Sequence, residues 1–173
     1  TWKRADHARR AWQERDNWLQ PKELQTKTKD HFPILDIIHE NKDYIVVNKT
    51  AGRISELSSY EPITTESLTL AHLLKSKPKP FIGVIHRLDR VTSGVLIFAK
   101  NKSNLVAFNR LFYNRKVQKT YLAIVKNKPP KNSGVLINYL KKNNAEKKAE
   151  VQLSQSNEAK ESILSYKLID QNN

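Results

Sequence analysis

Short apolar runs separated by polar turns make up most of the chain from position 33 onward, and they predict strands. The runs are Ile34 to His39, Tyr44 to Asn48, Val95 to Ala99, Val117 to Lys126, Gly134 to Leu140, Ala149 to Leu153 and Ser162 to Ile169. They are rich in β-branched and aromatic residues, which are typical of strands. Most connections between them are too short for parallel crossovers, so we expect the strands to pair largely antiparallel.

Two stretches have the apolar spacing that is typical of an amphipathic helix instead. Residues that can cap these helices are Thr64 or Thr65 for the first, and Asn101 or Ser103 for the second. Pro78 and Pro80 stop the first helix, and the second runs to about Arg115. The sequence therefore predicts an α+β fold, a mixed and largely antiparallel sheet with packed helices.

The first thirty-two residues have a different texture. They carry all three tryptophans of the chain and many basic residues, and an alanine-bearing helical face there ends at Pro21. Two interpretations stay open, a basic arm that docks on the main body and an arm that contacts RNA. We therefore divide the chain into an N-terminal arm, residues 1–32, and a single domain, residues 33–173.

Charge indicates the kind of partner. The chain has 31 Lys and Arg against 17 Asp and Glu, a net charge of +14. A protein this basic attracts polyanions such as nucleic acid. No apolar run approaches the ~18 residues that span a bilayer, so we expect no membrane partner. With no cysteine, four glycines and no paired acidic motif, we expect neither a metal nor a cofactor.

The candidate chemistry lies between His86 and Lys100, where a polar cluster precedes an apolar run. Asp89 stands beside Arg87 and Arg90 at the mouth of the predicted strand. In one interpretation Asp89 forms an ion pair that pins a turn. In the other it is a nucleophile or base, kept ionised by a nearby guanidinium. We interpret His86 as a hydrogen-bonding residue that orients the site rather than as a base.

Three segments carry a family resemblance. HRLD at 86–89, with TSG at 92–94 and the strand after it, closely resembles the signature of the RluA-type RNA pseudouridine synthases. YIVVNKTAG at 44–52 is similar to that family's VVNKPAG segment, with Thr50 in place of the usual proline. QKTYLAIV at 118–125 resembles its K-x-Y strand, in the family's order.

This resemblance implies an isomerase that converts a uridine of ribosomal or transfer RNA into its carbon-linked isomer, without cofactor or metal. The target base must leave the helix to be reached. Asp89 would be the nucleophile, Arg87 would occupy the space that the base vacates, and Tyr121 would stack on the uracil and assist proton removal. The remaining candidates for RNA contact are His86, Arg90, Lys119 and Lys49, the two lysines by supporting the site or by contacting phosphate.

The chain departs from the family pattern at its end. It stops before the family's TGR-x-HQIR-like segment, whose arginine pairs with the catalytic aspartate, so we expect a catalytic domain incomplete at its C-terminus. Arg90 is a candidate to substitute in part. The alternative hypothesis is a catalytically silent RNA-binding assembly factor on the same scaffold, and a small-molecule hydrolase fits poorly. We expect a cytoplasmic monomer.

Overall fold

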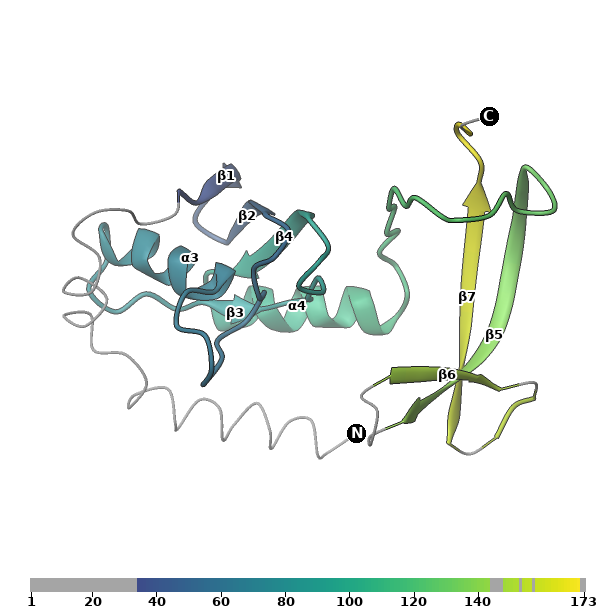
Figure 1. The fold of residues 1–173 in the computed structure, drawn as a ribbon. Helices are drawn as coiled ribbons and strands as arrows, with labels where there is room; N and C mark the ends of the chain where they lie inside the picture. Colours follow the sequence, from purple (N-terminus) through teal and green to yellow (C-terminus); the bar gives the residue numbers. More distant parts are fainter. Residues whose placement is uncertain (1–33, 144–147, 153, 157, 172–173) are drawn as a thin grey trace. The chain divides into compact units, whose positions relative to one another are not determined.

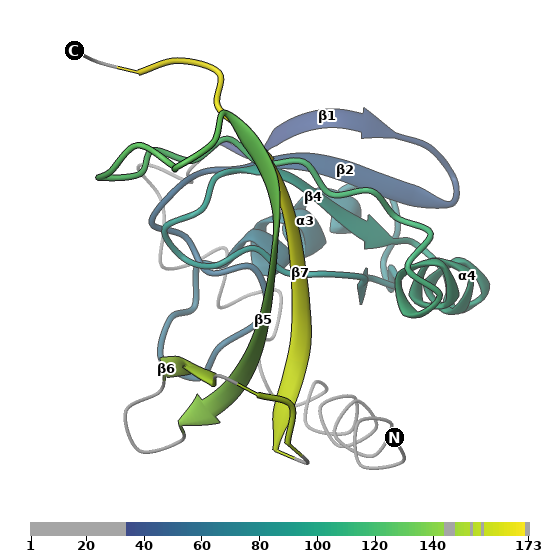
Figure 2. The ribbon, with the colours of Figure 1, turned by 90° about the vertical axis from the view of Figure 1, so that its right-hand side faces the viewer.

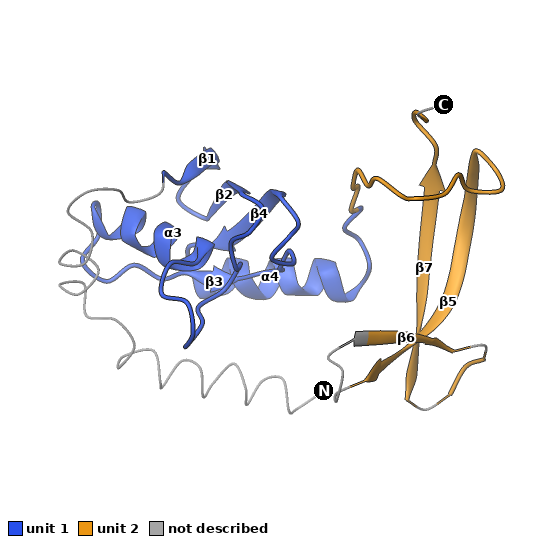
Figure 3. Ribbon diagram, in the orientation of Figure 1, with its two compact units in different colours: residues 1–118 blue, residues 119–173 orange. Residues whose placement is uncertain are grey.

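A computed structural model describes residues 34–143, 148–152, 154–156 and 158–171. The predicted arm, residues 1–32, lies outside the described residues, as do the alanine-bearing face and Pro21. The chain divides into two compact units between Gln118 and Lys119 (Figure 3). Each unit is described by itself below.

The first unit is built on a four-stranded antiparallel sheet with the order β1-β2-β4-β3 (Figure 1). Its strands are β1 (Asp36–Glu40), β2 (Tyr44–Lys49), β3 (Gly83–Val84) and β4 (Gly94–Ala99). The predictions for β1, β2 and β4 are confirmed, whereas β3 was not predicted. Two residues are too few to show an alternating pattern, so only the neighbouring strand β4 reveals β3.

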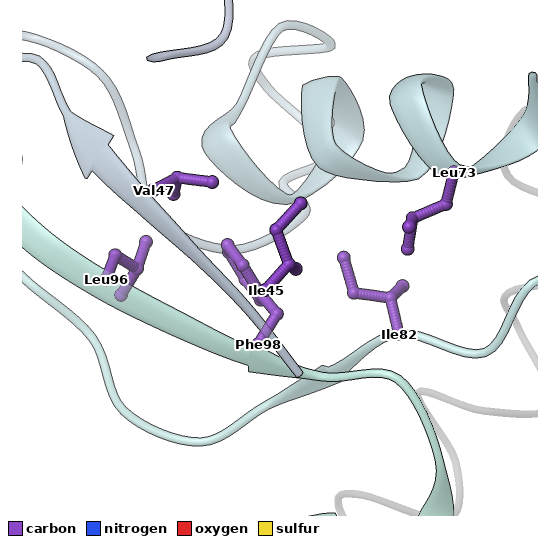
Figure 4. Close-up of a cluster of buried hydrophobic side chains, with 6 residues drawn as sticks. All are labelled: Ile45, Val47, Leu73, Ile82, Leu96 and Phe98. Atoms are coloured by element: carbon purple, nitrogen blue, oxygen red, sulfur yellow. The ribbon is translucent and has the colours of Figure 1, made fainter. Parts of the chain in front are cut away.

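One face of this sheet carries the hydrophobic core of the first unit. The buried cluster consists of Ile45, Val47, Leu73, Ile82, Leu96 and Phe98 (Figure 4). Register explains its composition, because Ile45 lies opposite Phe98 and Val47 opposite Leu96 on the paired strands β2 and β4. Leu73 enters this cluster from helix α3, so α3 covers this face.

Helix α3 (Thr65–Leu74) begins at the predicted cap, Thr64. The Thr64 hydroxyl accepts from the Ser67 amide at 3.1 Å, and the Ser67 hydroxyl accepts from the Thr64 amide at 2.9 Å. This reciprocal capping box satisfies two amides that a helix start leaves unpaired. The helix ends ahead of Pro78, as predicted.

Helix α4 (Lys102–Tyr113) packs against β3 and β4. The Asn101 side chain caps it by accepting from the Asn104 amide at 2.8 Å. The Phe108 ring meets the Tyr44 ring edge-on, with centroids 5.7 Å apart. Leu105 lies so close to Gly83 that a Cβ there would come within 2.9 Å of it. The predicted helix is confirmed, and its half-buried row faces the sheet.

The end of α4 offers a stabilising substitution. Arg115 has a φ of 54°, a left-handed conformation in which a side chain is costly. Its amide donates to the Phe112 carbonyl and the Lys116 amide to the Leu111 carbonyl, which is the Schellman pattern that favours glycine. We expect Arg115→Gly to raise the free energy of unfolding by about 1 kcal/mol in urea denaturation. Arg115→Ala keeps the Cβ and should give no such gain; equal gains would contradict this reason.

The second unit is a three-stranded antiparallel sheet with the order β6-β5-β7. Its strands are β5 (Ser133–Asn143), β6 (Lys148–Gln152) and β7 (Ala159–Lys167). β5 and β7 run side by side along their length (Figures 1 and 2). The three strands predicted for this part of the chain are confirmed, and the observed antiparallel pairing agrees with the predicted fold class.

One predicted strand is wrong. Residues 117–126 form no strand, although all of them are described. Strand propensity acts only when a neighbouring strand offers its edge. In the two described sheets, no strand takes residues 117–126 as its neighbour. The predicted alternation that placed Lys119 and Tyr121 on one face of a strand therefore does not hold.

The paired strands β5 and β7 expose apolar side chains on both of their faces. Ile137 lies opposite Ile163 on one face, and Leu136 lies opposite Leu164 on the other. All four side chains are exposed. Such alternation-free apolar runs are typical of strands that are buried on both sides.

In the part of the chain that the structure describes, no helix has the length and apolar character to cross a membrane.

Candidate active site

The candidate site forms where two loops leave neighbouring strands. Lys49, the last residue of β2, lies opposite Gly94, the first residue of β4. The segment after β2, residues 50–63, therefore runs beside the segment before β4, residues 85–93, which carries Asp89. The Gly52 amide donates to the Arg90 carbonyl at 2.7 Å and joins the two. Gly52 has a φ of 85°, which a side chain rarely adopts.

The Lys49 side chain links the two segments. Its side chain is 0% exposed. The Nζ atom donates to the carbonyls of Thr50 at 3.1 Å, Arg53 at 2.8 Å and Arg90 at 3.3 Å. A buried ammonium needs such partners, because burying an unpaired charge is very costly. The buried Nζ atom thus binds the backbone of both segments, and the two predicted roles of Lys49 stay predictions.

The charge of Lys49 interacts with the charges of the candidate site. Burial lowers the pKa of the Lys49 ammonium below its ordinary value of 10.5, and the charge of Arg53 lowers it further. The Asp89 carboxylate raises the pKa of Lys49, and the Arg90 guanidinium lowers it. Lys49 and Asp89 are therefore close enough for their charges to interact, with the cation in the interior and the carboxylate at the surface.

Ser55 fixes the backbone next to Asp89. Its hydroxyl donates to the Leu88 carbonyl at 2.6 Å and accepts from the Leu88 amide at 3.1 Å. Ser55 and Leu88 are both buried. One side chain thus satisfies both backbone groups of the residue before Asp89, as a paired strand would.

Asp89 itself is exposed at the tip of its segment. Its carbonyl accepts from the Thr92 amide at 3.0 Å, which closes a turn over residues 89–92. Leu88 anchors one side of this turn in the interior, and the bond from Gly52 to Arg90 anchors the other. A carboxylate on a fixed backbone that faces solvent can reach a macromolecular substrate.

The two arginines beside Asp89 are engaged by glutamates of the neighbouring segment. Arg87 pairs with Glu56, and Arg90 pairs with Glu61 at 2.5 Å. The Arg90 guanidinium also donates to the Gly52 carbonyl at 3.4 Å. The Arg90 guanidinium thus binds Glu61 of the neighbouring segment, and the pairing of Arg90 with Asp89 stays a prediction.

His86, at the start of the Asp89 segment, binds strand β4. Its Nε2 atom accepts from the Ile97 amide of β4 at 3.2 Å. Its ring stacks on Phe112 of α4, with centroids 5.3 Å apart and planes 18° apart. The imidazole thus continues the pairing of β4 beyond the end of the short strand β3. An imidazole that accepts through Nε2 carries its proton on Nδ1 when neutral.

Two predicted site residues lie in the second unit. Lys119 and Tyr121 follow the division at Gln118, whereas Asp89, Arg87, Arg90, His86 and Lys49 belong to the first unit. Tyr121 is 55% exposed and stands in a segment without helix or strand. The structure thus gathers five of the seven predicted residues around the two loops, and the roles of Lys119 and Tyr121 stay predictions.

Sequence reasoning missed the residues that hold the site together. Ser55, Glu56 and Glu61 lie in a stretch without periodicity, so no pattern marked them. Each binds a residue more than twenty-five positions away in the chain, which is Leu88 for Ser55, Arg87 for Glu56 and Arg90 for Glu61. Within the described ranges, no three His, Cys, Asp or Glu side chains gather in a way that could hold a metal ion.

Comparison with known proteins shows the family of the chain. A family model described as RNA pseudouridylate synthase matches residues 43–173. The match covers more than half of the chain, so the chain belongs to the RNA pseudouridylate synthase family. The resemblance to the RluA-type branch is confirmed, since relatives include ribosomal large subunit pseudouridine synthase D of Borreliella burgdorferi, 40% identical over 96 residues.

Other relatives set the extent of the likeness. An uncharacterized RNA pseudouridine synthase of Haemophilus influenzae is 36% identical over 108 residues, 62% of this chain and 46% of that protein. tRNA pseudouridine synthase C of Vibrio parahaemolyticus is 33% identical over 133 residues, 77% of this chain and 52% of that protein. The Borreliella match takes in 52% of this chain and 29% of that protein. The chain spans about half the length of the first two relatives.

A solved structure supports the fold. Human RNA pseudouridylate synthase domain containing 4 superposes with a TM-score of 0.61 and 24% identity, over 76% of this chain and 52% of that one. The described residues combine helices with antiparallel sheets, and together with this likeness they confirm the predicted fold class.

Proposed function

We propose that the protein is an RNA pseudouridine synthase that isomerises a uridine of ribosomal or transfer RNA through Asp89. The observation that carries the proposal is the exposed Asp89 carboxylate, in a chain of this family, on a backbone whose neighbouring residues are held by Ser55, Lys49 and Gly52. A nucleophile works best when its own backbone does not need to be ordered during the reaction.

The chemistry asks for one nucleophile and one proton acceptor. The bond from N1 of uracil to C1′ of ribose breaks, the base turns, and C5 bonds to C1′; the C5 proton is released to solvent and N1 takes up a proton. The Asp89 carboxylate would bond transiently to the sugar or the ring and leave when the new bond forms. Tyr121 would stack on the uracil and assist removal of the C5 proton.

Access to the base requires that it leave the RNA helix, which costs a few kcal/mol. We infer that Arg87, which is exposed and adjacent to the segment tip, enters the vacated space. To do so it must exchange its Glu56 partner for RNA. A pair between exposed side chains is worth about 0–1 kcal/mol, so this exchange is easy.

RNA as the substrate is supported by charge and by the printed names of relatives. The net charge of +14 attracts the phosphate backbone without regard to sequence. Relatives are named for transfer RNA or for the large ribosomal subunit. Arg90 and Lys119 are the exposed cations that we assign to phosphate contact.

The test is release of the C5 hydrogen. RNA transcribed with uridine labelled with tritium at C5 is incubated with the full-length protein, and pseudouridine is mapped in the same RNA. Tritium release with pseudouridine at a defined position is the expected result. RNA binding that falls with salt but yields no tritium and no pseudouridine would contradict the proposal.

That contradicting result is the one that a second candidate predicts, a silent RNA-binding assembly factor. The observation in its favour is that Glu56 and Glu61 hold the two arginines beside Asp89. In that case RNA affinity would also be unaffected by Asp89→Asn.

A further inference from the structure

A solvent-exposed tyrosine stands on the segment that faces Asp89. We call residues 53–63 the rim loop, because it carries Ser55, Glu56 and Glu61, which bind the Asp89 segment. Resting on the proposed function, we infer that Tyr60 of the rim loop is a stacking platform for an unpaired base of the RNA next to the target uridine.

The first argument is that the backbone of Tyr60 is held while its ring is open. Tyr60 is 96% exposed. Its amide donates to the Ser58 hydroxyl at 3.2 Å, which holds the backbone at a bend over residues 59–60. Pro62 follows Glu61 and restricts that residue to an extended backbone. An aromatic ring on a fixed backbone binds with a small loss of conformational entropy.

The second argument is proximity to the candidate nucleophile. Glu61, the next residue after Tyr60, binds Arg90 at 2.5 Å, and Arg90 directly follows Asp89. Two peptide bonds and one ion pair therefore connect Tyr60 with Asp89. A second pair, between Glu56 and Arg87, joins the same two segments on the other side of Asp89.

The third argument is chemical. When a base is turned out of a helix, its neighbour in the strand loses a stacking partner. An aromatic side chain can replace that partner for any base, because every base has a π-face. Arg90, the partner of the next residue Glu61, would bind a phosphate of the same RNA. The ligand of Tyr60 is thus a single unpaired nucleotide, recognised without regard to its sequence.

The experiment measures RNA affinity without turnover. In a full-length protein that carries Asp89→Asn, we compare Tyr60, Tyr60→Ala, Tyr60→Phe and Tyr60→Trp by fluorescence anisotropy of a labelled hairpin RNA with a uridine in its loop. We expect Tyr60→Ala to weaken binding about tenfold or more, because stacking on one base is lost. Tyr60→Phe and Tyr60→Trp should retain affinity, and the new tryptophan should be quenched when RNA binds.

A matched control separates stacking from exposure alone. Tyr113, at the end of α4, is 82% exposed, and Tyr113→Ala should leave RNA affinity unchanged. Melting temperatures should be equal for Tyr60, Tyr60→Ala and Tyr60→Phe, because an exposed ring contributes little to folding.

The outcomes distinguish this inference from the proposed function. If the protein with Asp89 intact forms pseudouridine but Tyr60→Ala binds RNA as well as Tyr60 does, the stacking role is overturned and the function stands. Weaker binding by Tyr60→Ala without any pseudouridine would keep the stacking role and overturn the function. Equal losses in Tyr60→Ala and Tyr60→Phe would also overturn stacking, since the ring would not be what binds.

Discussion

Replacement of Asp89 by asparagine is expected to lower the rate of tritium release from C5-labelled RNA by about 10⁴-fold or more. Asparagine has nearly the same shape, but its amide cannot form the transient bond that the carboxylate forms. The turn over residues 89–92 uses the backbone carbonyl of Asp89, so it is preserved in the variant. Single-turnover tritium release at saturating protein measures the chemical step without a contribution from binding.

The control for this variant is a carboxylate outside the two loops. Asp170 is exposed and bonds only locally, its Oδ1 accepting from the Gln171 amide at 2.8 Å. Asp170→Asn should release tritium at the rate of the unaltered protein. A rate for Asp89→Asn within about tenfold of that rate would exclude Asp89 as the nucleophile.

Replacement of Lys49 by methionine is expected to lower the free energy of unfolding by about 1–3 kcal/mol. Methionine fills a similar volume but donates no hydrogen bond, so the carbonyls of Thr50 and Arg53 lose their buried partner. Urea denaturation, followed by far-ultraviolet circular dichroism, measures the loss. The exposed Lys116 is the matched control, and Lys116→Met should change stability by less than about 0.5 kcal/mol.

The pKa of Lys49 adds a dependence on pH. Its value in the folded protein is lower than the ordinary 10.5. Between the two values the unfolded chain binds more protons at this position, so the contribution of Lys49 to stability rises with pH. Below the lowered value the ammonium is charged in both states, and its burial cost is fully present. The stability difference between the unaltered protein and Lys49→Met should therefore grow as the pH rises towards the ordinary pKa of 10.5. A difference that shrinks over this range would contradict the direction of the shift.

Local signals predicted most elements of the fold. Thr64 and Asn101 stand one residue before the helices that they cap, because a short polar side chain there satisfies free amides whatever the tertiary context. Alternation and apolar runs located β2, β4 and the strands of the second unit. The failure at residues 117–126 has the opposite cause, since a strand depends on the edge of another strand, which propensity does not encode.

The site was predicted only in part for the same reason. HRLD at 86–89 is a contiguous motif, so its family could be seen in the sequence. The partners of that motif are distant in the chain, and Ser55 pairs with Leu88 through one hydroxyl. A lysine at the end of a strand is normally exposed, so nothing in the sequence indicated that Lys49 is fully buried. The structure shows that the two loops cover the Lys49 side chain, and this arrangement is not encoded near Lys49 in the sequence.

The interlocked loops also have a consequence for motion. A surface loop usually opens by itself, at a free energy far below that of global unfolding. Here the amides of Gly52 and Leu88 bond across to the opposite segment, and the Lys49 side chain holds both segments at the end of β2. These amides exchange with solvent deuterium only when the two segments separate. The Asp89 segment thus belongs to the same cooperative unit as the strands. Its backbone is expected to stay ordered until the sheet unfolds.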